Sequence, residues 1–294
     1  MVGADSAAAL GPAYATCARF AWEHYENFPV ASRLLPARMR PHVAAVYAFA
    51  RLADDFADEG QRPPAERLAL LDAWRACLHG AAPDAALPPE SPHVFAALRD
   101  TIRTCGLPLL LFEDLLSAFR QDVTTSRYQS WTDVLDYCRR SANPVGRIVL
   151  GIAGYRDESL DRSSDALCTA LQLTNFWQDL ERDWRNGRLY LPLDECRRAA
   201  ADVADLDERR MTPPWQQVLD GAASLTAGRF EDGRMVCERV TGRLGLELRL
   251  TWLGGRRILE RLQRSRYDVF RHRPTLGTAD VPVLAGRLFR WRRR

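Results

Sequence analysis

The sequence contains no lysine, and all 41 of its basic residues are arginine. Genome-wide codon bias is the simplest explanation of this absence. It nevertheless fixes the chemistry available to the protein. Any side chain that binds phosphate here must be a bidentate guanidinium and not the point charge of an ammonium group.

Long apolar runs are also missing. No segment approaches the roughly 20 consecutive apolar residues that a membrane-spanning helix requires. The N-terminus lacks the basic and apolar stretches of a secretory signal. The seven cysteines form no Cys-x-x-Cys pair, which argues against a zinc site and against a disulfide framework. We therefore expect a cytoplasmic protein with reduced thiols.

Alternating strand patterns, internal repeats and linkers are absent too, whereas the apolar spacing is helical nearly throughout. Proline and glycine interrupt this spacing and predict where helices end. Because no linker divides the chain, we expect one all-α domain over residues 1–294. The expected helices cover about residues 12–26, 38–59, 64–79, 90–105, 109–121, 131–141, 145–154, 159–185, 213–236 and 242–271.

Two acidic clusters at helical spacing are the most informative feature of the chain. Asp54 and Asp58 stand four residues apart, as do Asp179 and Asp183, so each pair projects from one face of a helix. Like charges at this spacing repel one another unless a cation lies between them. Oxygen ligands without His or Cys favour Mg²⁺, so the clusters predict a magnesium and diphosphate site held between two facing helices.

A solvated acidic helix face is the alternative interpretation of any single pair of this kind. The neighbouring residues favour the metal site, because the other faces of both helices are too apolar for a surface helix. A mostly buried helix must direct its charged residues toward a polar cavity, since unpaired buried charge is very costly. The expected metal ligands are Asp54, Asp55, Asp58, Asn175, Asp179 and Asp183.

The residues that flank the acidic clusters extend the same pattern. Arg51 lies one turn and Tyr47 two turns before the first aspartates. Arg51 either pairs with a carboxylate or binds diphosphate oxygens, and its place in the polar stripe favours the second role. Gly187 is placed to cap the second acidic helix, and residues 188–192 are expected to form an extended flap.

Charge is distributed unevenly along the chain. From Arg256 onward twelve arginines stand against three acidic residues, so this part carries a net charge of +9 and the preceding part −6. Such a basic terminus suits an anionic membrane surface or an anionic substrate. No groove-reading module accompanies it, so we expect no nucleic-acid partner.

Residues 47–58, 172–183 and 187–192 resemble the squalene/phytoene synthase family. The likeness covers about residues 15–275 and leaves a basic tail over about residues 276–294. It implies a single helical bundle of the isoprenoid synthase type around a central cavity, in which two aspartate-rich helices bind Mg²⁺ and an isoprenyl diphosphate. By this resemblance the catalytic residues are Asp54, Asp58, Asp179, Asp183, Arg51 and Tyr47.

Two segments narrow the resemblance within the family. Residues 24–30 read His-Tyr-Glu-Asn-Phe-Pro-Val, where condensing members carry a serine-containing segment. Gln178 stands directly before Asp179, where condensing members carry arginine. Both segments resemble the branch of the family that forms hydroxysqualene in bacterial hopanoid pathways. This resemblance gives as substrate-binding residues His24, Tyr25, Asn27, Phe28, Tyr47, Arg51, Gln178, Arg188 and Tyr267.

The resemblance implies a Mg²⁺-dependent reaction in which presqualene diphosphate and water give hydroxysqualene and diphosphate, with no nicotinamide cofactor. One alternative is a condensing enzyme of the same family that makes presqualene diphosphate or phytoene from two prenyl diphosphates. Another is a non-catalytic, lipid-binding member of the family. The intact aspartates argue against this last alternative, because a scaffold needs no repelling acidic pairs.

Overall fold

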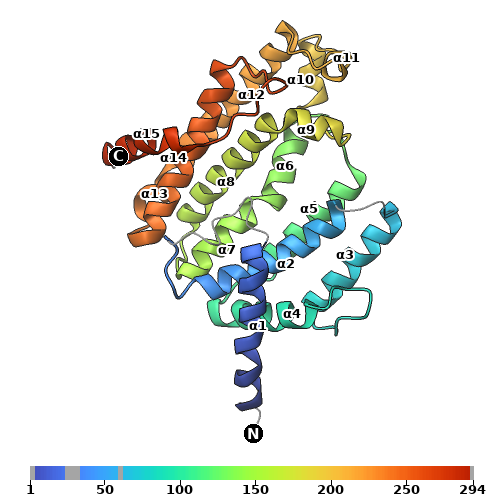
Figure 1. The fold of residues 1–294 in the computed structure, drawn as a ribbon, viewed down its shortest axis with the longest axis vertical. Coiled ribbons are helices and arrows are strands. Elements are labelled where there is room, and N and C mark those ends of the chain that lie inside the picture. Colours follow the sequence, from blue (N-terminus) through green and yellow to red (C-terminus); the bar gives the residue numbers. More distant parts are fainter. Residues whose placement is uncertain (1–3, 24–33, 59–61, 292–294) are drawn as a thin grey trace. The chain divides into compact units, whose positions relative to one another are not determined.

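The computed structural model describes residues 4–23, 34–58 and 62–291, and these residues form helices and turns without any sheet (Figure 1). One isolated parallel bridge joins Arg127 and Leu189. No helix among the described residues is both long enough and apolar enough to span a bilayer. The all-α fold predicted from the sequence is confirmed.

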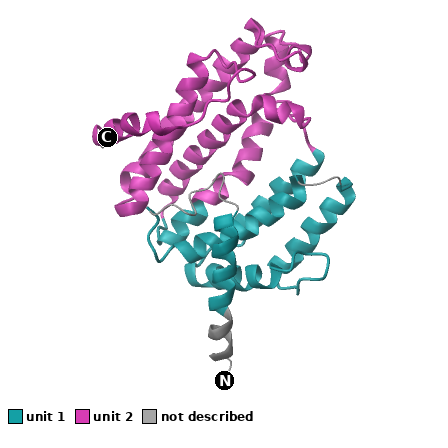
Figure 2. Ribbon diagram, in the orientation of Figure 1, with its two compact units in different colours: residues 1–124, 147–156 teal, residues 125–146, 157–294 magenta. Residues whose placement is uncertain are grey.

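The chain groups into two compact units, coloured separately in Figure 2. Unit 1 comprises residues 1–124 and 147–156, unit 2 comprises residues 125–146 and 157–294, and the division falls within α7 (Asn143–Ala153). The expectation of a single domain remains a prediction. The other helices of unit 1 are α1 (Ala4–Glu23), α2 (Arg40–Asp58), α3 (Pro64–Leu78), α4 (Ser91–Cys105) and α5 (Leu110–Thr124). Those of unit 2 are α6 (Trp131–Ser141), α8 (Glu158–Gln178), α9 (Leu180–Arg185), α10 (Leu193–Arg198), α11 (Ala204–Asp207), α12 (Pro213–Asp232), α13 (Arg234–Arg239), α14 (Gly242–Arg264) and α15 (Val281–Phe289).

Unit 1 is built around α2, which packs against α1, α3, α4 and α5. Phe49 of α2 lies at the centre of an aromatic cluster with Trp74, Phe95 and Phe112, at ring-centroid distances of 5.7–6.1 Å. The Trp74 indole donates a hydrogen bond to the Phe49 carbonyl oxygen at 3.2 Å, so its polar edge is satisfied inside the core. This packing buries three sides of α2 and holds the helix that carries the first acidic cluster.

Unit 2 is built around α8, which packs against α6, α12, α13 and α14. The Trp177 indole donates to the Thr226 hydroxyl of α12 at 2.9 Å, and the Phe176 ring stacks on Tyr190 at 3.7 Å. Glycine permits the closest approaches. A Cβ on Gly255 would lie 2.7 Å from both Leu171 and Phe230. The helix that carries the second acidic cluster is therefore fixed by contacts on several sides.

Most helix bounds expected from the sequence are confirmed within a few residues, including α2, α3, α4 and α6. Gly187 adopts φ +77° after the last turn of α9, as expected of a C-terminal cap. Residues 188–192 form no helix: Leu189 lies in the bridge to Arg127, the chain bends at Leu191, and the Leu189 amide donates to the Ser126 carbonyl oxygen at 3.0 Å.

Three long helices expected from periodicity are wrong in extent. The helix expected over 159–185 ends at Gln178 and resumes as α9, and the one expected over 213–236 is divided at Gly233. The helix expected to reach residue 271 ends at Arg264, because Arg266 and Tyr267 adopt φ values of +52° and +62°. Neither glycine nor proline marks this turn. Periodicity also missed the short helices α10, α11 and α15.

The contact at Gly233 predicts a large effect of a single methyl group. A Cβ there would lie 2.6 Å from the Leu167 backbone nitrogen, which cannot move aside. We expect Gly233→Ala to destabilise the protein by about 1–3 kcal/mol in urea unfolding. Gly228→Ala is the matched control, because nothing lies within 4 Å of its Cβ, and it should leave stability equal or slightly higher. Equal stability of the two variants would contradict the close approach of α12, α13 and α8.

Candidate functional site

The first acidic cluster lies on the last two turns of α2. Leu52, Ala53, Phe56 and Ala57 are buried, whereas the polar residues Tyr47, Arg51, Asp54 and Asp55 are partly exposed and Asp58 is exposed. The stripe expected from the sequence is therefore present. It forms because the apolar positions turn toward the core of unit 1 and leave the carboxylates on the remaining face.

The Arg51 guanidinium already compensates part of the negative charge of the first cluster. Arg51 contacts the Asp55 carboxylate at 2.8 Å and the Asp54 carboxylate at 3.5 Å. Asp54 is 36% exposed and Asp55 18%, so both retain access to solvent. Of the two roles that the sequence left to Arg51, the structure displays the pairing with carboxylates.

The second acidic cluster spans the junction of α8 and α9. Asp179 departs from helical geometry, with φ −102° and ψ 12°. Helical hydrogen bonds nevertheless continue through Asp179. Its backbone amide donates to the Asn175 carbonyl oxygen, and its carbonyl oxygen accepts from the Asp183 amide, each at 2.8 Å. The Asn175 side-chain amide also donates to the Asp179 carboxylate at 2.9 Å. The four-residue spacing of Asp179 and Asp183 thus survives the break.

Arg273 also belongs to this cluster, although no sequence pattern indicated it. Its guanidinium contacts both carboxylate oxygens of Asp179, one of them at 3.1 Å, and this hydrogen bonding raises the Arg273 pKa. Next to it, the Gln178 side-chain amide donates to the Pro274 carbonyl oxygen at 2.6 Å. Two adjacent residues of the acidic cluster therefore hold two adjacent residues of the segment after α14.

The flap after α9 closes against the end of this helix. The Arg188 amide donates to the Asp183 carbonyl oxygen at 2.7 Å, which places the partly exposed Arg188 next to the acidic cluster. Arg127 donates to the Gly187 carbonyl oxygen and stacks over the Trp184 ring at 4.7 Å. Asp183 and Arg188 are thereby held together by backbone contacts within unit 2.

Tyr267, another residue expected to bind substrate, is buried in the structure. Tyr267 is 2% exposed, and its hydroxyl donates to the Asp220 carboxylate at 2.6 Å. Burial raises the Tyr267 pKa, so its hydroxyl stays protonated. The proton of the Tyr267 hydroxyl is thus used in the hydrogen bond to Asp220. The expected substrate-binding residues His24, Tyr25, Asn27 and Phe28 lie outside the described residues.

The donor atoms of the two clusters fit Mg²⁺ in kind. All expected ligands are carboxylate or amide oxygens, which Mg²⁺ prefers, and they are exposed enough to leave room for the water that it retains. Within the described residues, no three His, Cys, Asp or Glu side chains are gathered as a ready-made metal site. The positive charge found at each cluster is a guanidinium, which shows that these carboxylates attract a cation.

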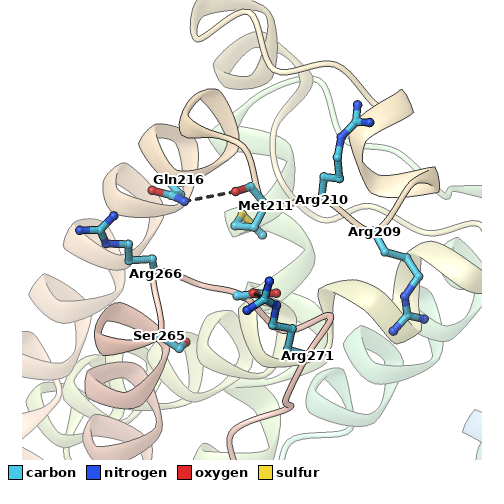
Figure 3. Close-up of a pocket in the computed structure, with 8 residues that line it drawn as sticks. Arg209, Arg210, Met211, Gln216, Ser265, Arg266 and Arg271 are labelled. Atoms are coloured by element: carbon cyan, nitrogen blue, oxygen red, sulfur yellow. Dashed lines mark hydrogen bonds and ion pairs between the residues drawn. The ribbon is translucent and has the colours of Figure 1, made fainter.

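An arginine-lined pocket lies elsewhere in unit 2, where the turn before α12 meets the turn after α14 (Figure 3). It has a volume of about 360 Å³, and the Gln216 amide donates to the Met211 carbonyl oxygen at its edge at 3.2 Å. Three of its four arginines are already in ion pairs, so its positive field is weaker than that of four unpaired arginines. The pairs are Arg209 with Glu181, Arg210 with Asp205 and Glu208, and Arg271 with Asp268.

Comparisons with known proteins agree with this fold and these motifs. The family model of squalene/phytoene synthase matches residues 22–280. Hydroxysqualene synthase of Rhodopseudomonas palustris is 40% identical over 81% of this chain and 80% of that protein. Hydroxysqualene synthase of Zymomonas mobilis is 37% identical over 90% of this chain and 89% of that protein.

Solved structures extend the likeness to three dimensions. The crystal structure of squalene synthase HpnC from Alicyclobacillus acidocaldarius matches with a TM-score of 0.80 and 38% identity, over 88% of this chain and 95% of that one. A dehydrosqualene synthase matches with a TM-score of 0.75 over 96% of both chains, and at 21% identity it shows the fold alone.

The fold and its two acidic motifs thus define an all-α protein of the isoprenoid synthase type. The chain belongs to the squalene/phytoene synthase family, as its sequence suggested. It is accordingly an enzyme of isoprenoid diphosphate chemistry.

The pairing of Arg273 with Asp179 predicts competition with metal. Replacing Arg273 by Gln removes the cation that now occupies the carboxylate, so Mg²⁺ alone should raise the melting temperature more than it does in the unmodified protein. Arg271→Gln is the matched control, because this arginine is 89% exposed and pairs with Asp268. Identical Mg²⁺ responses of both variants in differential scanning fluorimetry would contradict the competition.

Proposed function

We propose that this protein converts presqualene diphosphate and water into hydroxysqualene and diphosphate. The observation that carries this choice among the family's reactions is the likeness to two relatives named hydroxysqualene synthase, at 37–40% identity over at least 80% of each chain. The neutral Gln178 before Asp179 agrees with it, since the condensing branch was expected to carry arginine there.

Mg²⁺ is the proposed metal. Asp54, Asp55 and Asp58 would bind it at the first cluster, and the second cluster would bind it through Asn175, Asp179 and Asp183. When bound, Mg²⁺ supplies a Lewis acid that stabilises the negative charge of the departing diphosphate.

Arg51 and Arg273 are proposed to change partners when substrate arrives. Each now makes contacts with carboxylate oxygens, and a phosphate group offers the same planar fork an equivalent set of acceptors. Binding would exchange one anionic partner for another, so neither guanidinium has to be desolvated without a partner. Tyr47, on the same stripe of α2, and Arg188, beside Asp183, are proposed to contact the same diphosphate.

The proposed reaction breaks the carbon–oxygen bond, and the electron pair leaves with diphosphate. The carbocation rearranges and accepts a water oxygen, which then loses a proton to give the alcohol. Gln178 is proposed to orient this water. One N–H of its side-chain amide donates to the Pro274 carbonyl oxygen at 2.6 Å, and its amide oxygen can accept a hydrogen bond from the water. No step requires a hydride, so no nicotinamide cofactor is proposed.

We also propose that the enzyme works in the cytoplasm and contacts the inner membrane surface peripherally. Its proposed substrate and product are long hydrocarbons that partition into lipid. The net charge of +9 from Arg256 onward favours an anionic surface.

The proposed metal ligands predict a loss of turnover without a loss of fold. We expect Asp58→Asn and Asp179→Asn each to lower kcat by about 100-fold or more, because the charge that binds the metal is gone. Asp58→Asn should keep its melting temperature, since the change relieves repulsion between acidic residues. Asp179→Asn relieves repulsion and also loses the ion pair with Arg273, which is 42% exposed, so its melting temperature should change little. Asp232→Asn, at a 65% exposed carboxylate outside the clusters, is the control and should retain activity.

Linkage provides an independent test of the same site. Mg²⁺ together with diphosphate should raise the melting temperature of the unmodified protein far more than Mg²⁺ alone. This difference should vanish in Asp58→Asn and Asp179→Asn. Wild-type turnover in either variant would refute the two-cluster metal site.

The choice of reaction can be tested directly. We expect presqualene diphosphate with Mg²⁺ to give a thirty-carbon alcohol, without any added nicotinamide cofactor, when products are identified by mass spectrometry. Farnesyl and geranylgeranyl diphosphates, incubated separately, should yield little condensation product. Efficient formation of presqualene diphosphate or phytoene would instead establish the condensing reaction, and no turnover of any of the three would favour a non-catalytic role.

A further inference from the structure

The C-terminal helix α15 turns apolar side chains toward solvent. At 100° per residue, Val281, Pro282, Ala285 and Phe289 fall on one side of the helix. All four are exposed, Val281 to 63% and Phe289 to 93%. We call these four residues the outer face of α15. The opposite side is partly covered and consists of Val283, Leu284, Arg287 and Leu288.

This orientation differs from that of an ordinary surface helix, because α15 has apolar residues on its exposed side as well as on its partly covered side. A helix on the surface of a soluble protein buries its apolar stripe and exposes its charged one. Here no residue of α15 is buried, and the charged Arg287 points to the protein body while Phe289 faces outward. Phe289 is the most exposed large apolar residue that the structure describes.

Ion pairs fix α15 in this orientation. Arg287 contacts both carboxylate oxygens of Glu260 on α14, at 2.7 and 2.8 Å. Directly before the helix, Asp280 is 1% exposed and accepts from Arg257 at 3.0 Å and from Arg261 at 2.7 Å. A bidentate pair of this geometry specifies rotation as well as position. The outer face is therefore held outward by the structure.

An aromatic contact secures the other end. The Trp291 ring meets Trp252 of α14 edge to face at 5.2 Å, and the Arg234 guanidinium lies 4.3 Å over the Trp291 ring. Trp291 is partly buried, in contrast to the fully outward Phe289 two residues before it. Both ends of α15 are thus attached to the same face of unit 2.

The C-terminal end of the sequence carries charge of one sign. Residues 281–294 contain five arginines and no acidic residue. Arg290 is exposed at the edge of the outer face, and the nearby acids Glu260 and Asp280 are already paired with arginines. Apolar side chains bordered by unopposed positive charge are the combination that binds the interface of an anionic bilayer.

We propose that the outer face of α15 docks the enzyme on an anionic lipid surface, with Phe289 and Val281 inserted among the acyl chains and Arg290 at the headgroups. The inference rests on the proposed function only in that a lipophilic substrate and product give such docking a purpose. A second copy of this chain fits the face poorly. A stable dimer buries about 800 Å² per partner, more than four side chains on one short helix provide, and it would bring ten arginines together.

Vesicle binding without substrate tests this inference. Purified full-length protein is floated with vesicles of phosphatidylcholine alone and of phosphatidylcholine with phosphatidylglycerol. We expect binding to the anionic vesicles, weakened about tenfold by Phe289→Ser, since burial of one aromatic side chain contributes that much or more. Arg290→Ser should weaken binding to the anionic vesicles several-fold and leave the neutral ones unchanged.

Leu110→Ser is the matched control, because Leu110 is an apolar residue of unit 1 that is 67% exposed. It should bind vesicles like the unmodified protein, and all variants should keep their melting temperature. Equal binding of Phe289→Ser and unmodified protein, or equal losses in Phe289→Ser and Leu110→Ser, would overturn the proposal. So would a lipid-free dimer in sedimentation equilibrium that Phe289→Ser dissociates. Because no substrate is present, these outcomes leave the proposed reaction untouched.

Discussion

Repulsion between like charges on a helix is the constraint on which the site depends. Carboxylates four residues apart destabilise a helix unless positive charge lies close to them. The protein supplies that charge in two ways: Arg51 comes from the preceding turns of the same helix, whereas Arg273 comes from the segment after α14. In both cases the compensating group is a guanidinium, which a ligand-bound metal can replace without leaving the carboxylates unpaired.

The placement of the first cluster on one face of α2 could be predicted from the sequence, because the interactions that set it are local. The partner of Arg51 could not, since the sequence favoured diphosphate and the structure shows the carboxylates. The apolar period of α2 decides which face is buried, and Arg51 lies three and four residues from its partners. The second cluster could be predicted only in part. The four-residue spacing of its aspartates was predicted correctly. The helix break at Asp179 was not predicted, because tertiary contacts at the end of α8 override a continuous helical pattern.

The pairing of Arg273 with Asp179 joins residues 94 positions apart, and no periodicity reports such a contact. Gln178 is neutral, but the folded chain brings the Arg273 guanidinium to the next residue, Asp179. The positive charge at the second cluster therefore depends on the guanidinium groups that the fold brings there, and not on residue 178 by itself.

The lack of lysine gives these contacts a common character. A guanidinium has five donors in a fixed plane, so one arginine can bridge two carboxylates or hold both oxygens of one, as Arg51 does for Asp54 and Asp55 and Arg287 does for Glu260. The same fork serves a structural role at α15 and, in the proposed function, a ligand-exchanging role at the acidic clusters. The exposure of the arginines does not separate the two roles, since Arg51 and Arg287 are each 34% exposed. The carboxylates differ instead: Asp280 beside α15 is 1% exposed and is held by Arg257 and Arg261 together, whereas Asp54 of the first cluster is 36% exposed.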